Sequence, residues 1–244
     1  DRRPDAVMLC AAYTAVDRAE DEVEACFAVN SEGAKAVAEA CAEIGCKLLY
    51  LSTDYVFPGT GDRPWEPDDE PNPLNVYGLS KLRGEDAVRR LVSKHFIVRI
   101  SWLFGINGRN FVKTMLRLGK EKDEIRVVCD QIGSPTYSKD LSTLLADMIV
   151  TDKYGYYHAT NEGGYISWYD FTKEIFRQAV ELGHDEYGED RITVTPVTTK
   201  EYGVSKAARP FNSRLDKSKL WECGFEPLPT WQDALARYLK EISF

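Results

Sequence analysis

The chain has 244 residues, a formal net charge of −8, and 43% hydrophobic and 29% charged residues. This composition is typical of a globular protein of one or two domains, and it excludes collagen-like, coiled-coil and disordered chains. The acidic balance argues against non-specific binding to nucleic acid or to an anionic membrane. No apolar run approaches the roughly 20 residues that a membrane span needs.

The six cysteines and three histidines are scattered along the chain. None of them forms the close ligand pairs that a zinc site needs, so we expect no metal site. We interpret the cysteines as reduced thiols and expect a cytoplasmic location.

Short apolar runs alternate with segments of helical spacing over the first hundred residues. Strands are predicted over 6–10, 47–51 and 96–100. Helices are predicted over 17–30, 31–44 and 77–92. Such alternation is typical of βαβ units with a parallel sheet. Asp17 and Glu20 fall where the first helix starts, and the helix dipole is a sufficient explanation for carboxylates there.

The alternation loses its regularity near Phe104, where a second, smaller lobe is predicted to begin. Further helices are predicted over 110–118, 139–150, 167–182 and 230–242. Strand-like segments are predicted over 125–129, 192–197 and 209–213. We assign residues 1–104 with 137–160 to a nucleotide-binding domain, and residues 105–136 with 161–244 to a substrate-binding lobe.

Tyr77 and Lys81 are four residues apart on a predicted helix and therefore share one face. A neighbouring ammonium stabilises a phenolate and lowers the tyrosine pKa from its usual value of about 10. Such a pair can exchange a proton with a substrate oxygen. An isolated match of this kind is also common on protein surfaces, so its context decides.

Thr53 and Asp54 supply that context, because they follow the predicted strand 47–51. Ligands bind outside the carboxyl ends of strands in open α/β sheets. A hydroxyl there can hydrogen-bond a carbonyl, and a carboxylate can bind sugar hydroxyls. Turn chemistry before Gly59 is the alternative explanation.

With these residues in place, the sequence resembles the extended short-chain dehydrogenases/reductases. Within them it is similar to the dTDP-4-dehydrorhamnose reductases. The matching runs, in family order, are Cys10–Asp17 with Ala19-Glu20, Ser52–Phe57, Tyr77–Lys81 with Gly84-Glu85, Arg99–Gly105 with Asn110-Phe111, Asp130–Thr136 and Arg209–Ser213. The resemblance implies an α/β fold with a Rossmann-like, doubly wound parallel sheet and a smaller C-terminal substrate-binding lobe.

The resemblance also implies catalytic roles for four residues. Tyr77 would protonate the C4 keto oxygen of the sugar. Lys81 would lower the Tyr77 pKa and hydrogen-bond the nicotinamide ribose. Thr53 would hold the same keto oxygen, and Asp54 a sugar hydroxyl.

NADPH or NADH is the implied cofactor and hydride source. Ala11, Ala12 and Tyr13 would bind it together with Tyr77 and Lys81. The two alanines follow a strand end, where small residues let the backbone approach a cofactor; ordinary close packing explains them equally well.

Three more residues are implied to bind the substrate: Trp102 beside the sugar or nucleotide, Asn110 on the sugar nucleotide, and Arg209 on the diphosphate through a bidentate grip. A core role for Trp102 and a surface role for Arg209 remain open. We assign no role to Gln131 and Thr136 beyond shaping a pocket wall.

One element of the family is not found in the sequence. The Rossmann half begins with a strand, a glycine-rich turn and a helix that binds the pyrophosphate. No such glycine pattern occurs in these residues. The first predicted strand matches a later family strand, so the N-terminal strands, roughly fifty residues of the βαβαβ half, are expected to be missing from this chain.

The expected function is therefore NAD(P)H-dependent reduction of dTDP-4-dehydro-6-deoxy-L-mannose to dTDP-L-rhamnose. Nucleotide-sugar dehydratases typically carry Glu after the Thr-Asp pair, whereas Tyr55 stands there in this chain. Two alternatives remain: another nucleotide-sugar epimerase or dehydratase, and a non-catalytic regulatory subunit of the methionine adenosyltransferase type. The expected partners are the small-molecule substrate and, for a homodimer, a second copy of the chain.

Overall fold

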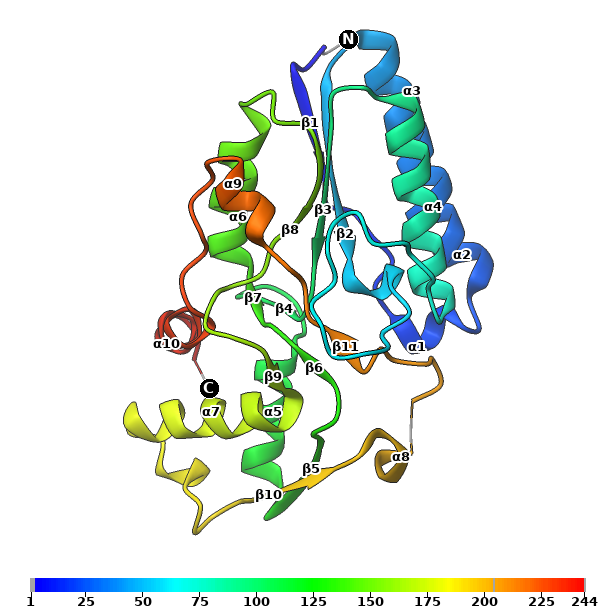
Figure 1. Cartoon of the computed structure of the whole chain (residues 1–244). Coiled ribbons are helices and arrows are strands. Elements are labelled where there is room, and N and C mark those ends of the chain that lie inside the picture. Colours follow the sequence, from blue (N-terminus) through cyan, green and yellow to red (C-terminus); the bar gives the residue numbers. More distant parts are fainter. Residues whose placement is uncertain (1–2, 204, 244) are drawn as a thin grey trace. The chain divides into compact units, whose positions relative to one another are not determined.

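Four parallel strands form the sheet of the first of two structural units, in the order β1-β2-β3-β8 (Figure 1). The strands are β1 (Ala6–Leu9), β2 (Lys47–Thr53), β3 (His95–Ile100) and β8 (Gly155–His158). The structure is a computed structural model that describes residues 3–203 and 205–243. Near-continuous apolar runs such as Leu48–Leu51 suit strands that are covered on both faces. The predicted α/β fold with a parallel sheet is confirmed.

The two units are defined by how densely their residues contact one another. Unit 1 comprises the described residues of Asp1–Ile100, Thr143–Ala159 and Ser205–Glu226. Unit 2 comprises the described residues of Ser101–Ser142, Thr160–Val204 and Pro227–Phe244.

Two helices of unit 1, α3 (Ala34–Ile44) and α4 (Val76–Leu91), lie on the same face of its sheet (Figure 1). The small side chains of α3 allow close packing against β1 and β2. The core on this face consists of Ala34, Ala38, Cys41, Cys46, Leu48, Tyr50, Val88, Val92 and Ile97. On the other face, Tyr157 of β8 packs edge-on against Phe225, with ring centroids 5.8 Å apart.

The helical region before β2 differs from the prediction. The helix breaks after α1 (Val16–Ala19) and resumes in α2 (Val23–Phe27), which continues through a π-helical turn (Ala28–Gly33) into α3. The predicted boundary between residues 30 and 31 is therefore wrong. A π turn leaves the regular helical bonding pattern, and such turns are frequent at functional sites.

The segment Ser205–Glu226 belongs to unit 1, whereas the sequence analysis grouped it with the substrate-binding lobe. Backbone contacts explain the difference: Asn212 N–H donates to the Gly59 carbonyl at 2.9 Å, and Trp65 N–H donates to the Arg214 carbonyl at 2.9 Å. Within this segment lie β11 (Asn212–Ser213) and α9 (Ser218–Glu222), and the loop it meets carries the 3₁₀ turn Asp54–Val56.

Unit 2 has its own strands and helices. The strands are β4 (Leu103–Phe104), β5 (Glu124–Val128), β6 (Ile132–Gly133), β7 (Thr136–Tyr137), β9 (Ile166–Ser167) and β10 (Thr193–Val197). The helices are α5 (Phe111–Glu121), α7 (Trp168–Glu181), a 3₁₀ turn (Asp185–Tyr187), α8 (Thr199–Tyr202) and α10 (Trp231–Glu241). Strands β5 and β10 pair in parallel, and the predicted helices and strands of this region are confirmed within a few residues.

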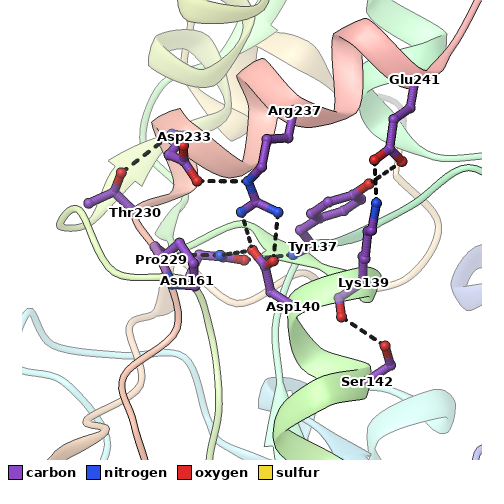
Figure 2. Close-up of polar contacts among 10 residues, drawn as sticks. All are labelled: Tyr137, Lys139, Asp140, Ser142, Asn161, Pro229, Thr230, Asp233, Arg237 and Glu241. Carbon is purple, nitrogen blue, oxygen red and sulfur yellow. Dashed lines mark hydrogen bonds and ion pairs between the residues drawn. The ribbon is translucent and has the colours of Figure 1, made fainter.

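Helix α6 (Ser138–Ile149) begins in unit 2 and ends in unit 1. Its first turn and the strand before it bind α10 (Figure 2). Arg237 of α10 donates to both carboxylate oxygens of Asp140 in α6, at 2.8 and 2.7 Å. Tyr137 of β7 donates to Glu241 of α10 at 2.8 Å. These contacts fix the C-terminal helix on the aromatic core of unit 2. None of the helices in the described ranges is both long and apolar enough to cross a membrane.

Candidate active site

Thr53 and Asp54 lie at the carboxyl end of β2, as predicted. Thr53 ends the strand and caps the following 3₁₀ turn, since its hydroxyl oxygen accepts a hydrogen bond from Tyr55 N–H at 3.2 Å. The same hydroxyl donates to Asp54 Oδ1 at 3.0 Å. Both side chains are buried, so the strand end presents a dry, polar corner.

Tyr77 in the first turn of α4 reaches this corner, with its hydroxyl beside that of Thr53. Burial raises the Tyr77 pKa well above its ordinary value, and the Thr53 hydroxyl, as a potential donor to the phenolate, opposes that effect. The lowered pKa expected from the sequence is therefore not observed, because desolvation outweighs the other influences. The side chain is held as a protonated acid.

Lys81, one turn further along α4, is 2% exposed. Its ammonium donates to the Leu51 carbonyl of β2 at 2.8 Å and lies 3.9 Å from the centre of the Tyr50 ring. Burial lowers the Lys81 pKa to about 8, and the nearby Glu85 carboxylate partly opposes this shift. The structure thus brings Lys81 to the same strand as Thr53, while its direct action on Tyr77 stays a prediction.

The residues between and after Tyr77 and Lys81 have packing roles. A Cβ on Gly78 would lie 2.2 Å from the Tyr55 carbonyl oxygen, and one on Gly84 would lie 2.3 Å from the Tyr50 hydroxyl. Only glycine lets α4 approach β2 and the 3₁₀ turn after it this closely. Ser80 donates to the Tyr77 carbonyl at 2.7 Å. The small residues of the motif therefore determine how closely α4 packs against the strand end.

Asn30, in the π-helical turn, fixes the segment after β1 that was predicted to bind cofactor. Its side-chain oxygen accepts from Tyr13 N–H at 2.8 Å, and its amide donates to the Tyr13 carbonyl at 3.0 Å. The same amide group donates to Ser80 at 3.0 Å. Sequence reasoning missed Asn30 because it lies inside a helical pattern, where nothing distinguishes it. Ala11 and Ala12 precede Tyr13 at this strand end, and their contact with cofactor stays a prediction.

Arg209 is fully engaged within unit 1. It donates to Asp17 at 2.7 Å, to the Tyr55 hydroxyl at 3.0 Å and to Ser205 at 2.9 Å. Tyr55 in turn packs edge-on against Tyr77, with ring centroids 5.5 Å apart. Asp17 thus has a specific partner 192 residues away, beyond the helix-start role given to it from the sequence. The grip of Arg209 on a diphosphate stays a prediction.

The buried Asp54 carboxyl provides a test of the electrostatics of this corner. Its Oδ2 atom has no hydrogen-bond partner among the described residues, and burial raises its pKa to about 6. A folded-state pKa above the unfolded value destabilises the fold as pH rises through the window between them. We expect Asp54→Asn to raise the free energy of unfolding at pH 7.5 by about 2 kcal/mol, and by little at pH 3.5, below the unfolded pKa.

Urea unfolding at both pH values would measure this effect, with the exposed Asp68→Asn as the matched control. An Asp54→Asn protein whose stability is unchanged at pH 7.5 would contradict the buried, destabilised carboxylate.

The remaining two predicted site residues, Trp102 and Asn110, lie in unit 2. Asn110 caps α5: it accepts from Lys113 N–H at 3.0 Å and donates to Gly105 O at 2.8 Å and to the Tyr238 hydroxyl at 3.0 Å. Helix capping therefore accounts for this side chain, and its contact with a sugar nucleotide stays a prediction.

Trp102 is strained and stacked. Of the described residues other than glycine, it alone has a positive φ, of 51°. Its ring lies 3.6 Å from that of Trp168, centroid to centroid, with 14° between the planes. Strained residues cluster at functional sites, where the surrounding structure holds them. Stacking on Trp168 supplies such a constraint here.

Because the two indoles are so close, their electronic transitions should couple and give a pair of opposite circular-dichroism bands. We expect Trp102→Phe and Trp168→Phe each to abolish this couplet, since either removes one of its two partners. Trp221→Phe, which changes an exposed tryptophan, should leave it intact. A couplet that survives in Trp168→Phe would show that this stack is not formed.

Within residues 3–203 and 205–243, no group of three or more histidine, cysteine or acidic side chains could hold a metal ion. The six cysteines are all free thiols in the structure.

The whole chain, residues 1–244, matches the family described as RmlD substrate binding domain. The chain belongs to this family. A dTDP-4-dehydrorhamnose reductase of Escherichia coli (strain K12) is 40% identical over 245 residues, which cover 98% of this chain and 80% of that relative. One from Streptomyces griseus is 43% identical and matches 96% of this chain and 76% of its own length.

Two solved structures have the same fold as this chain. A dTDP-4-dehydrorhamnose reductase from Bacillus anthracis str. Ames, in complex with NADP, is 45% identical and superposes with a TM-score of 0.90 over 98% of this chain and 82% of its own. The dTDP-glucose 4,6-dehydratase DesIV of Streptomyces venezuelae shares the fold, with a TM-score of 0.78 at 18% identity. The Rossmann-like sheet expected from the sequence is thereby confirmed.

Proposed function

We propose that this protein reduces the C4 keto group of dTDP-4-dehydro-6-deoxy-L-mannose to give dTDP-L-rhamnose, with NADPH or NADH as reductant. The observation that carries the proposal is the corner at the end of β2, where the Tyr77 hydroxyl lies beside Thr53 and Lys81 is bound to the same strand. Membership of the RmlD family and identities of about 40% to named reductases support it.

The residues of the corner suit the nicotinamide end of the cofactor. Asn30 holds the backbone at Tyr13, next to the small side chains of Ala11 and Ala12. The ammonium of Lys81 has three N–H donors and uses one on the Leu51 carbonyl, which leaves donors for ribose hydroxyls. When bound, the cofactor supplies a hydride to the sugar carbon. The NADP complex of the Bacillus anthracis relative favours NADPH.

Side chains of this chain donate the proton and orient the sugar. Tyr77, buried and protonated, gives its proton to the C4 oxygen as that oxygen gains negative charge. Thr53 turns its hydroxyl proton from Asp54 to the same oxygen and so holds it in place. The charged Lys81 stabilises the phenolate that remains on Tyr77. Asp54 accepts a hydrogen bond from a sugar hydroxyl.

Three further residues are proposed to bind the sugar nucleotide: Trp102, Asn110 and Arg209. For Arg209, binding a diphosphate means exchanging its bond to Asp17 for bonds to phosphate oxygens. The strained backbone of Trp102 supports a functional role for its ring.

Tyr55 favours reduction over dehydration. The position after Asp54 holds a half-buried phenol that accepts a hydrogen bond from Arg209, so no second carboxylate is available there for an elimination. The intact Thr53, Tyr77 and Lys81 weigh against a purely regulatory subunit.

The test is an assay of the complete gene product that contains this chain, with NADPH and the keto sugar. NADPH oxidation that depends on the sugar supports the proposal. A folded protein that binds both compounds and oxidises no NADPH would reject it. We also propose a cytoplasmic location, supported by the six free thiols, and a homodimer as the assembly to test by light scattering.

A further inference from the structure

The ammonium of Lys81 rests on the ring face of a residue to which sequence reasoning gave no role. Tyr50 lies in the middle of β2 and is 1% exposed, and Lys81 Nζ is 3.9 Å from its ring centre. An aromatic face attracts a cation through the negative side of its quadrupole, and the attraction grows when the pair is shielded from water. Lys81 and Tyr50 are shielded in this way, since both are buried.

Tyr50 is fixed from both ends, so its ring is a rigid platform. Its hydroxyl donates to the Asn30 carbonyl at 3.2 Å, which is part of the π-helical turn. Gly84 faces the hydroxyl and has no side chain to displace it. Gly84, in the third turn of α4, therefore leaves room for the Tyr50 ring, and Lys81, in the second turn, places its ammonium over the face of that ring.

Few other groups favour the charged form of Lys81. Burial disfavours the charged form by lowering the Lys81 pKa. Three side chains oppose this shift: Glu85 of α4, Cys10 after β1 and Cys26 of α2. Glu85 is itself bound by Arg99 of β3 at 2.7 Å, so its charge is largely compensated. Tyr77 on α4 is protonated and carries no charge. The ring of Tyr50 and the Leu51 carbonyl both lie directly against the ammonium.

We propose that Tyr50 is a positioning residue of the candidate active site: its ring face holds the Lys81 ammonium in place and keeps it charged. The consequence for turnover rests on the proposed reductase function, because a charged Lys81 is what stabilises the Tyr77 phenolate. Removing the ring makes Lys81 lose its proton at lower pH. The alkaline limit of the reaction then moves to lower pH as well.

The titration of Lys81 can be measured without substrate or cofactor. In protein labelled with ¹⁵N-lysine, the ¹⁵Nζ resonance of Lys81 is assigned by its loss in Lys81→Arg and followed against pH. We expect Tyr50→Leu to lower the Lys81 titration midpoint by about one unit. Tyr50→Phe keeps the ring face and should leave the midpoint unchanged.

Fluorinated phenylalanines at position 50 separate the ring face from packing. They keep nearly the same shape, but each added fluorine weakens the negative face of the ring. Starting from Tyr50→Phe, we expect the Lys81 midpoint to fall stepwise with one, two and three fluorines. This series keeps the proposal testable even where Tyr50→Leu does not fold, as judged by near-ultraviolet circular dichroism.

Three results would overturn the proposal: a Lys81 midpoint unchanged in folded Tyr50→Leu, a shift in Tyr50→Phe as large as that in Tyr50→Leu, or a flat response to fluorination. In the complete gene product, the alkaline limb of kcat should move with the midpoint, while KM for the sugar stays constant. A titration that shifts in a protein with no reductase activity would sustain this inference and reject the proposed function.

Discussion

Tyr77→Phe is expected to lower kcat for keto-sugar reduction by about 10²–10⁴-fold, the usual contribution of a positioned general acid. The substitution removes only the hydroxyl that lies beside Thr53, while the ring keeps its edge-on contact with Tyr55. KM for the sugar should change much less than kcat, because the proton is transferred only as the reaction proceeds. Steady-state kinetics on the complete gene product measures both.

Tyr202→Phe is the matched control, since it removes a hydroxyl from an exposed tyrosine of unit 2. Its kcat should equal that of the unchanged protein. A Tyr77→Phe enzyme that turns over at an undiminished rate would remove Tyr77 from the reaction.

The second large expected effect is on stability, and it concerns the buried ion pair between Arg99 of β3 and Glu85 of α4. Arg99 donates to Glu85 through two bonds, of 2.9 and 2.7 Å, and to the Pro67 carbonyl at 3.0 Å. Both charged side chains are almost completely buried. Arg99→Met leaves the Glu85 carboxylate without its partner in a dry interior. We expect it to lower the free energy of unfolding by about 3–5 kcal/mol.

The double variant Glu85→Leu, Arg99→Met removes both charges. It therefore separates the effect of losing the ion pair from the effect of leaving one buried charge unpaired. Because it leaves no unpaired ion, we expect it to recover most of the stability lost in Arg99→Met. Urea unfolding of the single and double variants, compared as a cycle, measures the coupling. A single variant as stable as the unchanged protein would contradict the tight burial of this pair.

The sequence predicted the parts of the site that depend on local pattern. The apolar run 47–51 marked a buried strand, and Thr53 and Asp54 follow it, so their place at the sheet edge could be inferred from chain order alone. Tyr77 and Lys81 could be placed on one helix face because the helical period is regular. Both inferences need only neighbouring residues.

Long-range contacts escaped prediction. The bond between Arg209 and Asp17 joins residues 192 positions apart, and no spacing rule reports it. The return of Ser205–Glu226 to unit 1 depends on backbone bonds such as that between Asn212 and Gly59. Strand β8 was missed because its four residues, beginning with Gly155, form no long apolar run.

A third group of features could have been inferred but was not. Asn110 precedes a helical segment, a position where asparagine commonly caps the first turn, and the structure shows that cap. The family resemblance implies a substrate role for the same side chain, and the cap is the role that the structure shows. Asn30 offered no such signal, because its use depends on a π turn and on the backbone of Tyr13.

The most direct test of the account follows the fate of a single deuterium. The complete gene product is supplied with NADPH deuterated at the transferable position and with dTDP-4-dehydro-6-deoxy-L-mannose, and the product is examined by NMR. We predict deuterium at C4 of dTDP-L-rhamnose, at a rate that collapses in Tyr77→Phe. A product with no deuterium at C4, or with label exchanged from solvent at another ring carbon, would contradict reduction at this site.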